Sequence, residues 1–478
     1  MATPSRSRRA LPLALLLLGG CAIGPNYHRP DTQTPPAYRD ETRKSQESMA
    51  DLSWWDLFKD PQLRVLLHDA VDQGFDVRIA LTRVDQAHAI AAQVRGQLLP
   101  AVGYNGLADR GRNTLLGQPF TEGDGATANG FAGYLGAAWE LDLWGRVRRL
   151  DEQARAQYYA SEAGRRAVLL TVVSETATAY YELLELDEEL VIARDTTGAF
   201  NESLKLFNRQ LEGGVVSRLD TASAEAQLET TNARIPEIER QIAIKENQLS
   251  LLLGRSPGPI ARGATLSDEP APPVVPPGLP SQLLERRPDV QQAEQAARAA
   301  NANIGVTVGG FLPRIGLSAL LGAVSPELSS ITNHESFLWN IGANVSGPVF
   351  QGGGLHGEYE ESKAQWEMAK LQYQQAALAA FGDVADALVS RQKLDEVRER
   401  QERAVRAYEE AVKLSTERYK AGKASYFEVL QAQELLYPAQ VTLAQTKRDQ
   451  FTAVVQLYKA LGGGWKMTAA EQTAPAPQ

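Results

Sequence analysis

The chain has 478 residues, of which 43% are hydrophobic and 22% charged, and its formal net charge is −9 at pH 7. This acidic balance argues against a nucleic-acid binder, because such proteins present basic surfaces. A single cysteine excludes an intrachain disulfide and leaves a zinc or iron–sulfur site without a second sulfur ligand. We therefore expect the cysteine to have a local role.

Residues 1–20 have the pattern of a secretory signal peptide. Three arginines form a basic start, and residues 11–18 form an apolar core that is too short to span a bilayer. The Leu-Gly-Gly-Cys stretch that ends at Cys21 resembles the lipobox of bacterial lipoproteins. The resemblance implies cleavage before Cys21, a diacylglycerol on its sulfur and an acyl chain on its new amino group. Ala22 replaces the aspartate that marks inner-membrane retention in Gram-negative bacteria, which implies transport to the outer membrane. The alternative is an ordinary signal peptide followed by an incidental cysteine.

The remainder contains an internal duplication. Asp76-Val77 aligns with Asp289-Val290, 213 residues later, and Gly214 aligns with Gly422, 208 residues later. Self-similarity over such lengths indicates a repeated structural unit. The predicted segments are an extended N-terminal segment 21–59, repeat 1 over 60–255, a Pro-rich linker 256–282, repeat 2 over 283–463 and a disordered tail 464–478.

Each repeat has the same predicted order: a helix, two strands, a long helix, a tight turn and a return helix. The first repeat has strands at about 100–112 and 129–143, a long helix over 147–211 and a return helix over 217–254. The second has strands at about 313–324 and 336–347, a long helix over 355–420 and a return helix over 425–461. The first long helix lacks proline and would extend about 97 Å at 1.5 Å per residue.

The return helices have two informative features. Apolar residues recur every seven positions in the first one, which predicts coiled-coil packing; they are Leu228, Ile235, Ile242 and Leu249. Pro236 and Pro438 lie inside the two return helices. We expect both to bend their helices, because proline removes a backbone donor and clashes one turn back.

The strands alternate in polarity. Phe131, Leu135 and Trp139 share one face, whereas Tyr134 and Glu140 share the other. A half-buried sheet of a soluble protein gives the same alternation, but four matching strands after a lipoprotein signal favour lipid-facing strands. Four strands cannot close on themselves, and an open edge in lipid leaves backbone groups unpaired. Other copies must supply the remaining strands, eight in total for two chains and twelve for three.

Several motifs together resemble the outer membrane factors, the TolC-like channels, in particular the lipoprotein branch that serves resistance–nodulation–division (RND) efflux pumps. They are "CAIGPNYHRP", "SWWDLFKDPQLRVLLHDAV", "WELDLWGRVRR", "LLERRPDVQQAEQ" and "RYKAGKASYFEVLQAQ". The resemblance covers residues from Cys21 to about Trp465. It implies an α+β membrane protein with an internally duplicated TolC-like fold. Three copies would form a twelve-stranded β-barrel in the outer membrane and a long α-helical barrel in the periplasm.

The resemblance also implies partners: a homotrimer, a periplasmic adaptor protein, an inner-membrane RND-type pump and outer-membrane lipid. The adaptor would contact the two helix–turn–helix tips, at Gly214 and Ser217 and at Gly422 and Ser425. The alternative is that these glycines and serines only end and begin helices.

Some family members close the periplasmic tip with a ring of aspartates. Here Ala424 and Ser425 occupy the positions of that acidic residue. Asp220 and Glu428 follow within a turn and are the candidates for a substitute acidic ring. The alternative is that both only favour a helix N-terminus through the helix dipole.

Motifs for catalysis and for metals are missing from the sequence. The five histidines show no i, i+4 pairing, and no nucleophile elbow or nucleotide-binding loop occurs. We therefore expect a passive exit duct and no enzyme, cofactor or nucleic-acid partner. The rival interpretation is a lipid-anchored periplasmic coiled-coil scaffold. The cargo stays open among drugs, solvents, metals and aromatic acids.

Overall fold

A computed structural model describes residues 22–38, 57–112, 127–270 and 280–463. The signal peptide, Cys21 and the tail 464–478 lie outside the described residues. The chain divides into two compact units. Unit 1 contains residues 1–30, 84–161 and 292–373, and unit 2 contains residues 31–83, 162–291 and 374–478.

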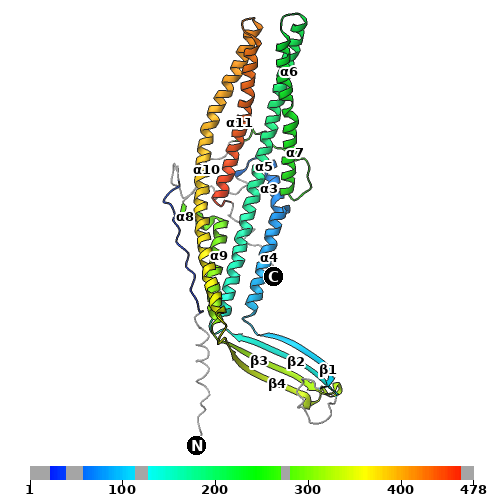
Figure 1. Cartoon of the computed structure of the whole chain (residues 1–478), viewed down its shortest axis with the longest axis vertical. Helices are drawn as coiled ribbons and strands as arrows, with labels where there is room; N and C mark the ends of the chain where they lie inside the picture. Colours follow the sequence, from blue (N-terminus) through cyan, green and yellow to red (C-terminus); the bar gives the residue numbers. More distant parts are fainter. Residues whose placement is uncertain (1–21, 39–56, 113–126, 271–279, 464–478) are drawn as a thin grey trace. The chain divides into compact units, whose positions relative to one another are not determined.

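The elements follow the same order in both halves of the chain (Figure 1). In the first half they are α3 (Pro61–Gln73), α4 (Phe75–Gly96), β1 (Ala101–Arg112), β2 (Thr127–Leu141), α5 (Arg146–Glu212), α6 (Arg218–Asn232) and α7 (Arg234–Leu252). In the second half they are α8 (Pro280–Arg286), α9 (Pro288–Gly310), β3 (Arg314–Ser325), the 3₁₀ turns η3 (Leu328–Ser330) and η4 (His334–Ser336), β4 (Phe337–Ser346), α10 (Gly354–Lys420) and α11 (Tyr426–Ala460). The strands and long helices lie within two residues of the predicted ranges.

Two details differ from the predicted elements. The single helix expected before each strand pair is two helices, α3 with α4 and α8 with α9. The predicted return helix 217–254 is also two helices, because α6 ends at Asn232 and α7 begins at Arg234. Pro236 explains this break, since it cannot donate to the Asn232 carbonyl and its ring clashes there. Pro438, in contrast, lies inside the continuous helix α11.

The two sequence repeats are not the two compact units, and each unit contains segments of both repeats. The reason is the pairing of strands. β2 of the first repeat pairs with β3 of the second, so both repeats share a single antiparallel sheet with the order β1-β2-β3-β4 (Figure 1). Each unit therefore contains corresponding segments of both repeats.

The register of the sheet places residues of like polarity in rows. One row contains Tyr104, Leu135, Leu321 and Trp339, and the neighbouring row contains Val102, Ala137, Ala319 and Ile341. The opposite face has residues such as Asn340 and Ser318. The sheet thus has one continuous apolar face, as the alternation of the strands predicts.

Side-chain hydrogen bonds and an ion pair stabilise the connection between β2 and α5. The Asp142 carboxylate accepts hydrogen bonds from the backbone N–H groups of Val147 at 3.0 Å and Arg148 at 2.9 Å. It thereby satisfies donors that the first turn of a helix leaves unpaired. Glu140 pairs with Arg146 at 2.9 Å, and the Trp139 indole donates to the Leu98 carbonyl at 3.0 Å.

The core of unit 2 includes the seam expected for the first return helix. Ile238 of α7 is buried against Leu186 and Ala193 of α5, with Ile235 and Ile242 packed beside them. This confirms that the seven-residue spacing faces a neighbouring helix. Among the described residues, no helix combines the length and the apolar character needed to cross a membrane.

Candidate functional site

The apolar face of the sheet is a large exposed surface in unit 1. Trp339 is 67% exposed and Ile341 76%, and Tyr104 is 89% exposed. Large contiguous apolar surfaces on folded proteins mark contact with membranes or partners. The strand length of 10–15 residues is close to the requirement for crossing a bilayer at a tilt.

The edges of the sheet are its second functional feature. In the part of the chain that the structure describes, β1 pairs only with β2, and β4 pairs only with β3. Each edge strand therefore directs about half of its backbone N–H and C=O groups away from the sheet. In lipid these groups need partners.

The two helical tips of unit 2 have the same turn. At the first tip the N–H of Val215 donates to the Gln210 carbonyl at 2.8 Å, and the N–H of Gly214 donates to the Leu211 carbonyl at 3.0 Å. The second tip repeats this pair of bonds, from Lys423 to Arg418 and from Gly422 to Tyr419, both at 2.9 Å. These are Schellman motifs, which need a left-handed residue at the turn. Gly214 and Gly422 supply it, with φ angles of 72° and 70°.

The serines that follow begin the next helices, but they act differently. Ser217 forms a capping box with Asp220, which accepts from the Ser217 N–H at 2.9 Å. These hydrogen bonds from Ser217 lower the pKa of Asp220. Ser425 has an extended backbone before α11 but makes no capping hydrogen bond through its side chain. Nearby Glu428 pairs with Arg418 at 3.6 Å.

Aromatic side chains join the two hairpins near their tips. Phe207 of α5 packs edge-on against Tyr426 of α11, with ring centroids 4.2 Å apart. Tyr419 of α10 contacts the same two rings and donates its hydroxyl proton to Gln210 at 2.7 Å. The predicted contact residues Gly214, Ser217, Gly422 and Ser425 thus belong to two turns of one packed unit.

The structure adds candidates that the sequence reasoning missed. Leu219 and Phe427 are 74% and 70% exposed, and both occupy the second helical position after a tip. They are equivalent in the duplication, since the 208-residue offset that relates Gly214 to Gly422 also relates them. The offset could have shown from the sequence that the two positions are equivalent, but it does not show that their side chains are exposed.

Buried charges lie in the middle of unit 2. The Glu185 side chain of α5 is 5% exposed and lies 3.4 Å from the Arg448 guanidinium of α11. Burial raises the pKa of Glu185 to about 7, despite the opposing effect of Arg448. Burial and the adjacent Asp60 likewise raise the pKa of Glu269 to about 7. These groups titrate near neutral pH.

A second polar contact ties the linker to the core. The Tyr180 hydroxyl donates to the Asp60 carboxylate and accepts from the Gly263 N–H at 2.9 Å. Arg262 of the same linker pairs with Asp187 at 2.8 Å and also with Glu246. Residues 256–270 of the predicted linker are therefore irregular in backbone but specifically attached, whereas its predicted end at 282 is wrong, because α8 begins at Pro280.

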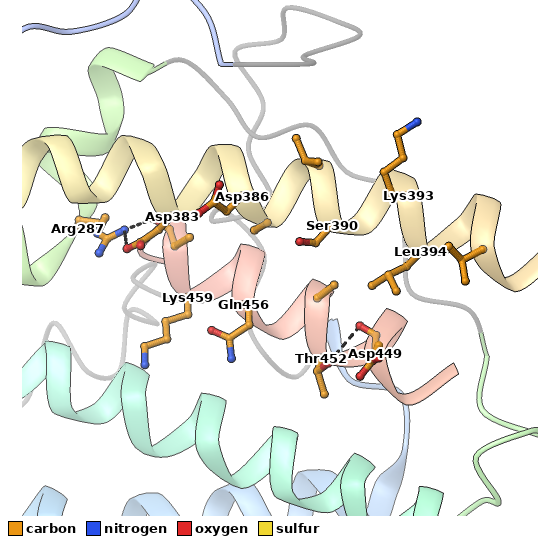
Figure 2. Close-up of a pocket in the computed structure, with 15 residues that line it drawn as sticks. Arg287, Asp383, Asp386, Ser390, Lys393, Leu394, Asp449, Thr452, Gln456 and Lys459 are labelled. Carbon is orange, nitrogen blue, oxygen red and sulfur yellow. Dashed lines mark hydrogen bonds and ion pairs between the residues drawn. The ribbon is translucent and has the colours of Figure 1, made fainter. Parts of the chain in front are cut away.

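A cavity of about 840 Å³ lies along α10 and α11 in unit 2 (Figure 2). Its lining mixes both charges, with Asp383 and Asp386 near one end and Lys393 farther along α10. Arg287 pairs with Asp383 at 2.8 Å and donates to the Ala460 carbonyl at 3.2 Å. This arginine, between α8 and α9, therefore contacts both α10 and α11. Among the described residues, no group of three or more acidic, histidine or cysteine side chains is placed to hold a metal ion.

Comparison with known proteins identifies the family. The family model described as outer membrane efflux protein matches residues 66–255 and 279–463, once in each repeat. The chain is 34% identical to the probable efflux pump outer membrane protein TtgC of Pseudomonas putida, over 99% of this chain and 98% of the relative. It is 31% identical to the probable outer membrane lipoprotein SilC of Salmonella typhimurium, over 94% and 97% of the two chains.

A solved structure agrees with these matches. The open-state outer membrane channel MtrE of Neisseria gonorrhoeae superimposes with a TM-score of 0.84 at 30% identity, covering 93% of this chain and 99% of that one. The relatives are efflux and channel proteins, and the α+β fold with long helices and a small antiparallel sheet is theirs as well. The chain therefore belongs to the outer membrane efflux protein family and is the outer membrane channel component of an efflux system.

Proposed function

We propose that three copies of this chain form one passive exit duct, attached to the outer membrane by a lipid on Cys21 and docked at its helical tips to a periplasmic adaptor. The adaptor would connect the duct to an inner-membrane RND-type pump, which supplies the energy. The observation that most supports this proposal is the four-stranded sheet, with one exposed apolar face and two open edges.

The open edges support an assembly of several copies. A sheet in lipid must satisfy all its backbone groups, and each unpaired group costs several kcal/mol. If β1 of one copy pairs with β4 of the next, the unpaired backbone groups of both edges are satisfied. Because every copy makes the same contact, the copies can close into a ring. Three copies of the four-stranded sheet give twelve strands, wide enough for solutes, whereas two give eight strands with a lumen filled by side chains.

The tips support docking of an adaptor. The exposed Leu219 and Phe427 add apolar contact area beside the turns at Gly214 and Gly422. Three copies would present six such tips in a ring. A ring of matching helical hairpins on the adaptor would complement it. Asp220 and Glu428 directly follow Leu219 and Phe427 in the chain, and we propose them as candidates for the periplasmic gate.

Lipidation of Cys21 is supported by the lipobox and by the relative SilC, which is named a lipoprotein. Coverage of 97% of SilC by this chain extends the similarity over nearly the whole of both proteins. Mass spectrometry of the N-terminal peptide would detect the diacylglycerol and the N-acyl chain. An unmodified thiol at Cys21 would refute this part of the proposal.

Conductance measurements test the duct. Purified protein in planar bilayers should produce discrete conductance steps, and vesicles that contain it should leak small solutes. The matched variant pair is Leu321→Arg, on the apolar face, and Leu320→Arg, on the opposite face. The proposal predicts that the first variant fails to insert and the second inserts with an altered conductance. Sealed vesicles with correctly folded parent protein would contradict it.

Cross-linking in cells tests the docking. A photo-reactive residue at Leu219 or Phe427 should cross-link to a periplasmic adaptor, identified by mass spectrometry, and one at exposed Glu225 serves as the control. Cross-links only between copies of this chain would refute contact at the tips. They would leave the conductance result untouched.

A further inference from the structure

The residues directly after Cys21 are held in place although they form no helix or strand. We call residues 22–30 the strap; they belong to unit 1. The Ile23 N–H donates to the Trp144 carbonyl at 3.0 Å, in the connection between β2 and α5. The strap therefore begins against the segment where the sheet continues into the long helix.

Arg149 of α5 binds the beginning of the strap. It is 4% exposed, and its guanidinium donates to the carbonyl oxygens of Ile23 at 3.0 Å and Gly24 at 3.3 Å. It also donates to Asn26 Oδ1 at 2.7 Å and pairs with Glu152 at 2.6 Å. A buried guanidinium has five donors to satisfy, and most of these partners are in the strap.

Two glycines leave room for the strap backbone. A Cβ added to Gly145 would lie 2.6 Å from the Ala22 Cα, and one added to Gly305 of α9 would lie 2.7 Å from the Ile23 carbonyl oxygen. Real Cβ atoms do not approach backbone atoms so closely. Glycine at both positions thus forms a cradle that fits residues 22–24.

The other end of the strap, at Tyr27 and Arg29, is also held by side-chain contacts. Arg29 forms a bidentate ion pair with Glu294 of α9, at 3.0 and 2.6 Å, and the Glu294 side chain is 8% exposed. The Tyr27 ring lies 4.9 Å from the Arg298 guanidinium carbon and packs edge-on against Trp366 of α10. Planar bidentate pairs with one buried partner are among the stronger charge-assisted contacts.

We propose that the strap and its cradle position the lipid anchor: they hold Ala22, the residue that follows the lipidated cysteine, beside the sheet-to-helix connection, so that the lipid and the apolar sheet face meet the membrane together. This inference rests on the proposed lipidation of Cys21. Consecutive Cα atoms are about 3.8 Å apart, so a fixed Ala22 confines Cys21 closely. A free strap of this length would have an r.m.s. reach of about 15–18 Å. Docking removes that freedom and raises the effective concentration of the sheet at the membrane surface.

Spin labelling tests the cradle itself. Lipidation blocks the sulfur of Cys21, so Pro25→Cys provides the one reactive thiol, at an exposed strap position. We expect an immobile nitroxide spectrum in this parent and loss of the immobile component in Arg149→Ala. Gly305→Ala is the second variant, because its added Cβ would lie 2.7 Å from both the Ile23 carbonyl oxygen and the Arg149 Cγ, so that the strap or the arginine that holds it must shift, while alanine favours helix α9. The controls are Arg155→Ala, whose side chain is 60% exposed, and Gly357→Ala, whose added Cβ meets open space.

Insertion kinetics test the positioning role. Gly305→Ala should slow the appearance of membrane-inserted sheet severalfold, and Gly357→Ala should not. In chains exported with a non-lipidating signal and Ser at position 21, the same Gly305→Ala change should have no further effect, since there is no lipid to position. The inference would be overturned if the label stayed immobile in both Arg149→Ala and Gly305→Ala. It would also be overturned if Gly305→Ala slowed membrane insertion equally with and without the lipid. A reactive Cys21 thiol in the wild type would instead refute lipidation, and the positioning role with it.

Discussion

Replacing Glu185 by glutamine should make the folded chain less sensitive to pH. Glu185 is buried on α5, and the charged groups around it are Arg448 and Asp449 of α11 and Glu182 and Glu189 of its own helix. Its pKa is raised from 4.5 to about 7, chiefly by burial. The folded state therefore binds the proton more tightly than the unfolded state does.

The sign follows from this difference in proton binding. Below pH 4.5 both states are protonated, and stability is unaffected. Between pH 4.5 and about 7 the unfolded state ionises while the folded state keeps its proton, so stability falls across this interval and levels off above it. A shift from 4.5 to about 7 corresponds to about 3 kcal/mol at pH 8. With an unfolding entropy of about 2 cal/mol/K per residue, this is a melting-temperature difference on the order of 5 °C for a unit of this size.

The assay is thermal unfolding of the purified protein in detergent at pH 5 and pH 8. Glu185→Gln should match the parent at pH 5 and melt on the order of 5 °C higher at pH 8, because it keeps the shape of the side chain without the charge. Arg448 also pairs with Asp449 at 2.7 Å, a contact that the substitution does not remove. Glu225→Gln, at an exposed position of α6, is the control. A variant that melts below the parent at pH 8 would refute the reasoning, because the Arg448 contact would then outweigh the cost of burial.

Three further predictions follow from other contacts. Gly214→Ala should lower the free energy of unfolding by about 1 kcal/mol, since the residue has a positive φ, and should speed hydrogen exchange at the Val215 amide. The control Gly213→Ala, whose added Cβ meets nothing closer than 3.6 Å, should change neither quantity. Tyr180→Phe should destabilise unit 2 by about 1–3 kcal/mol in thermal or denaturant unfolding, because it leaves Asp60 and the Gly263 N–H without this partner. The control Tyr159→Phe, on an exposed ring, should leave the stability unchanged. Leu321→Arg should lower the fraction of membrane-inserted protein by the equivalent of about 2–4 kcal/mol, and equal insertion of Leu321→Arg and Leu320→Arg would contradict the assignment of the two faces.

Regular features of the sequence predicted the elements well. The strands, the long helices and the apolar face follow from alternation and from the duplication, because both patterns repeat over many residues. The tips were predicted because glycine and serine at a turn have direct backbone consequences. Gly214 and Gly422 adopt the left-handed conformation that this reasoning requires.

Features that depend on distant contacts could not be predicted. The duplication predicts the four strands, but it does not give the pairing of β2 with β3 that joins the two repeats in one sheet. The strap has no periodicity, so its attachment to Arg149 and Glu294 is visible only in three dimensions. The raised pKa of Glu185 depends on burial between two helices that are far apart in sequence.

Cross-linking between the two sheet edges tests the central claim most directly. A cysteine at Asn340 in β4 would be combined in turn with single cysteines along β1, in lipidated protein whose Cys21 sulfur is blocked. If three copies close a ring through β1 and β4, one register should give covalent dimers and trimers and nothing larger. A ladder that continues beyond three chains, or the absence of cross-links in every register, would contradict the account.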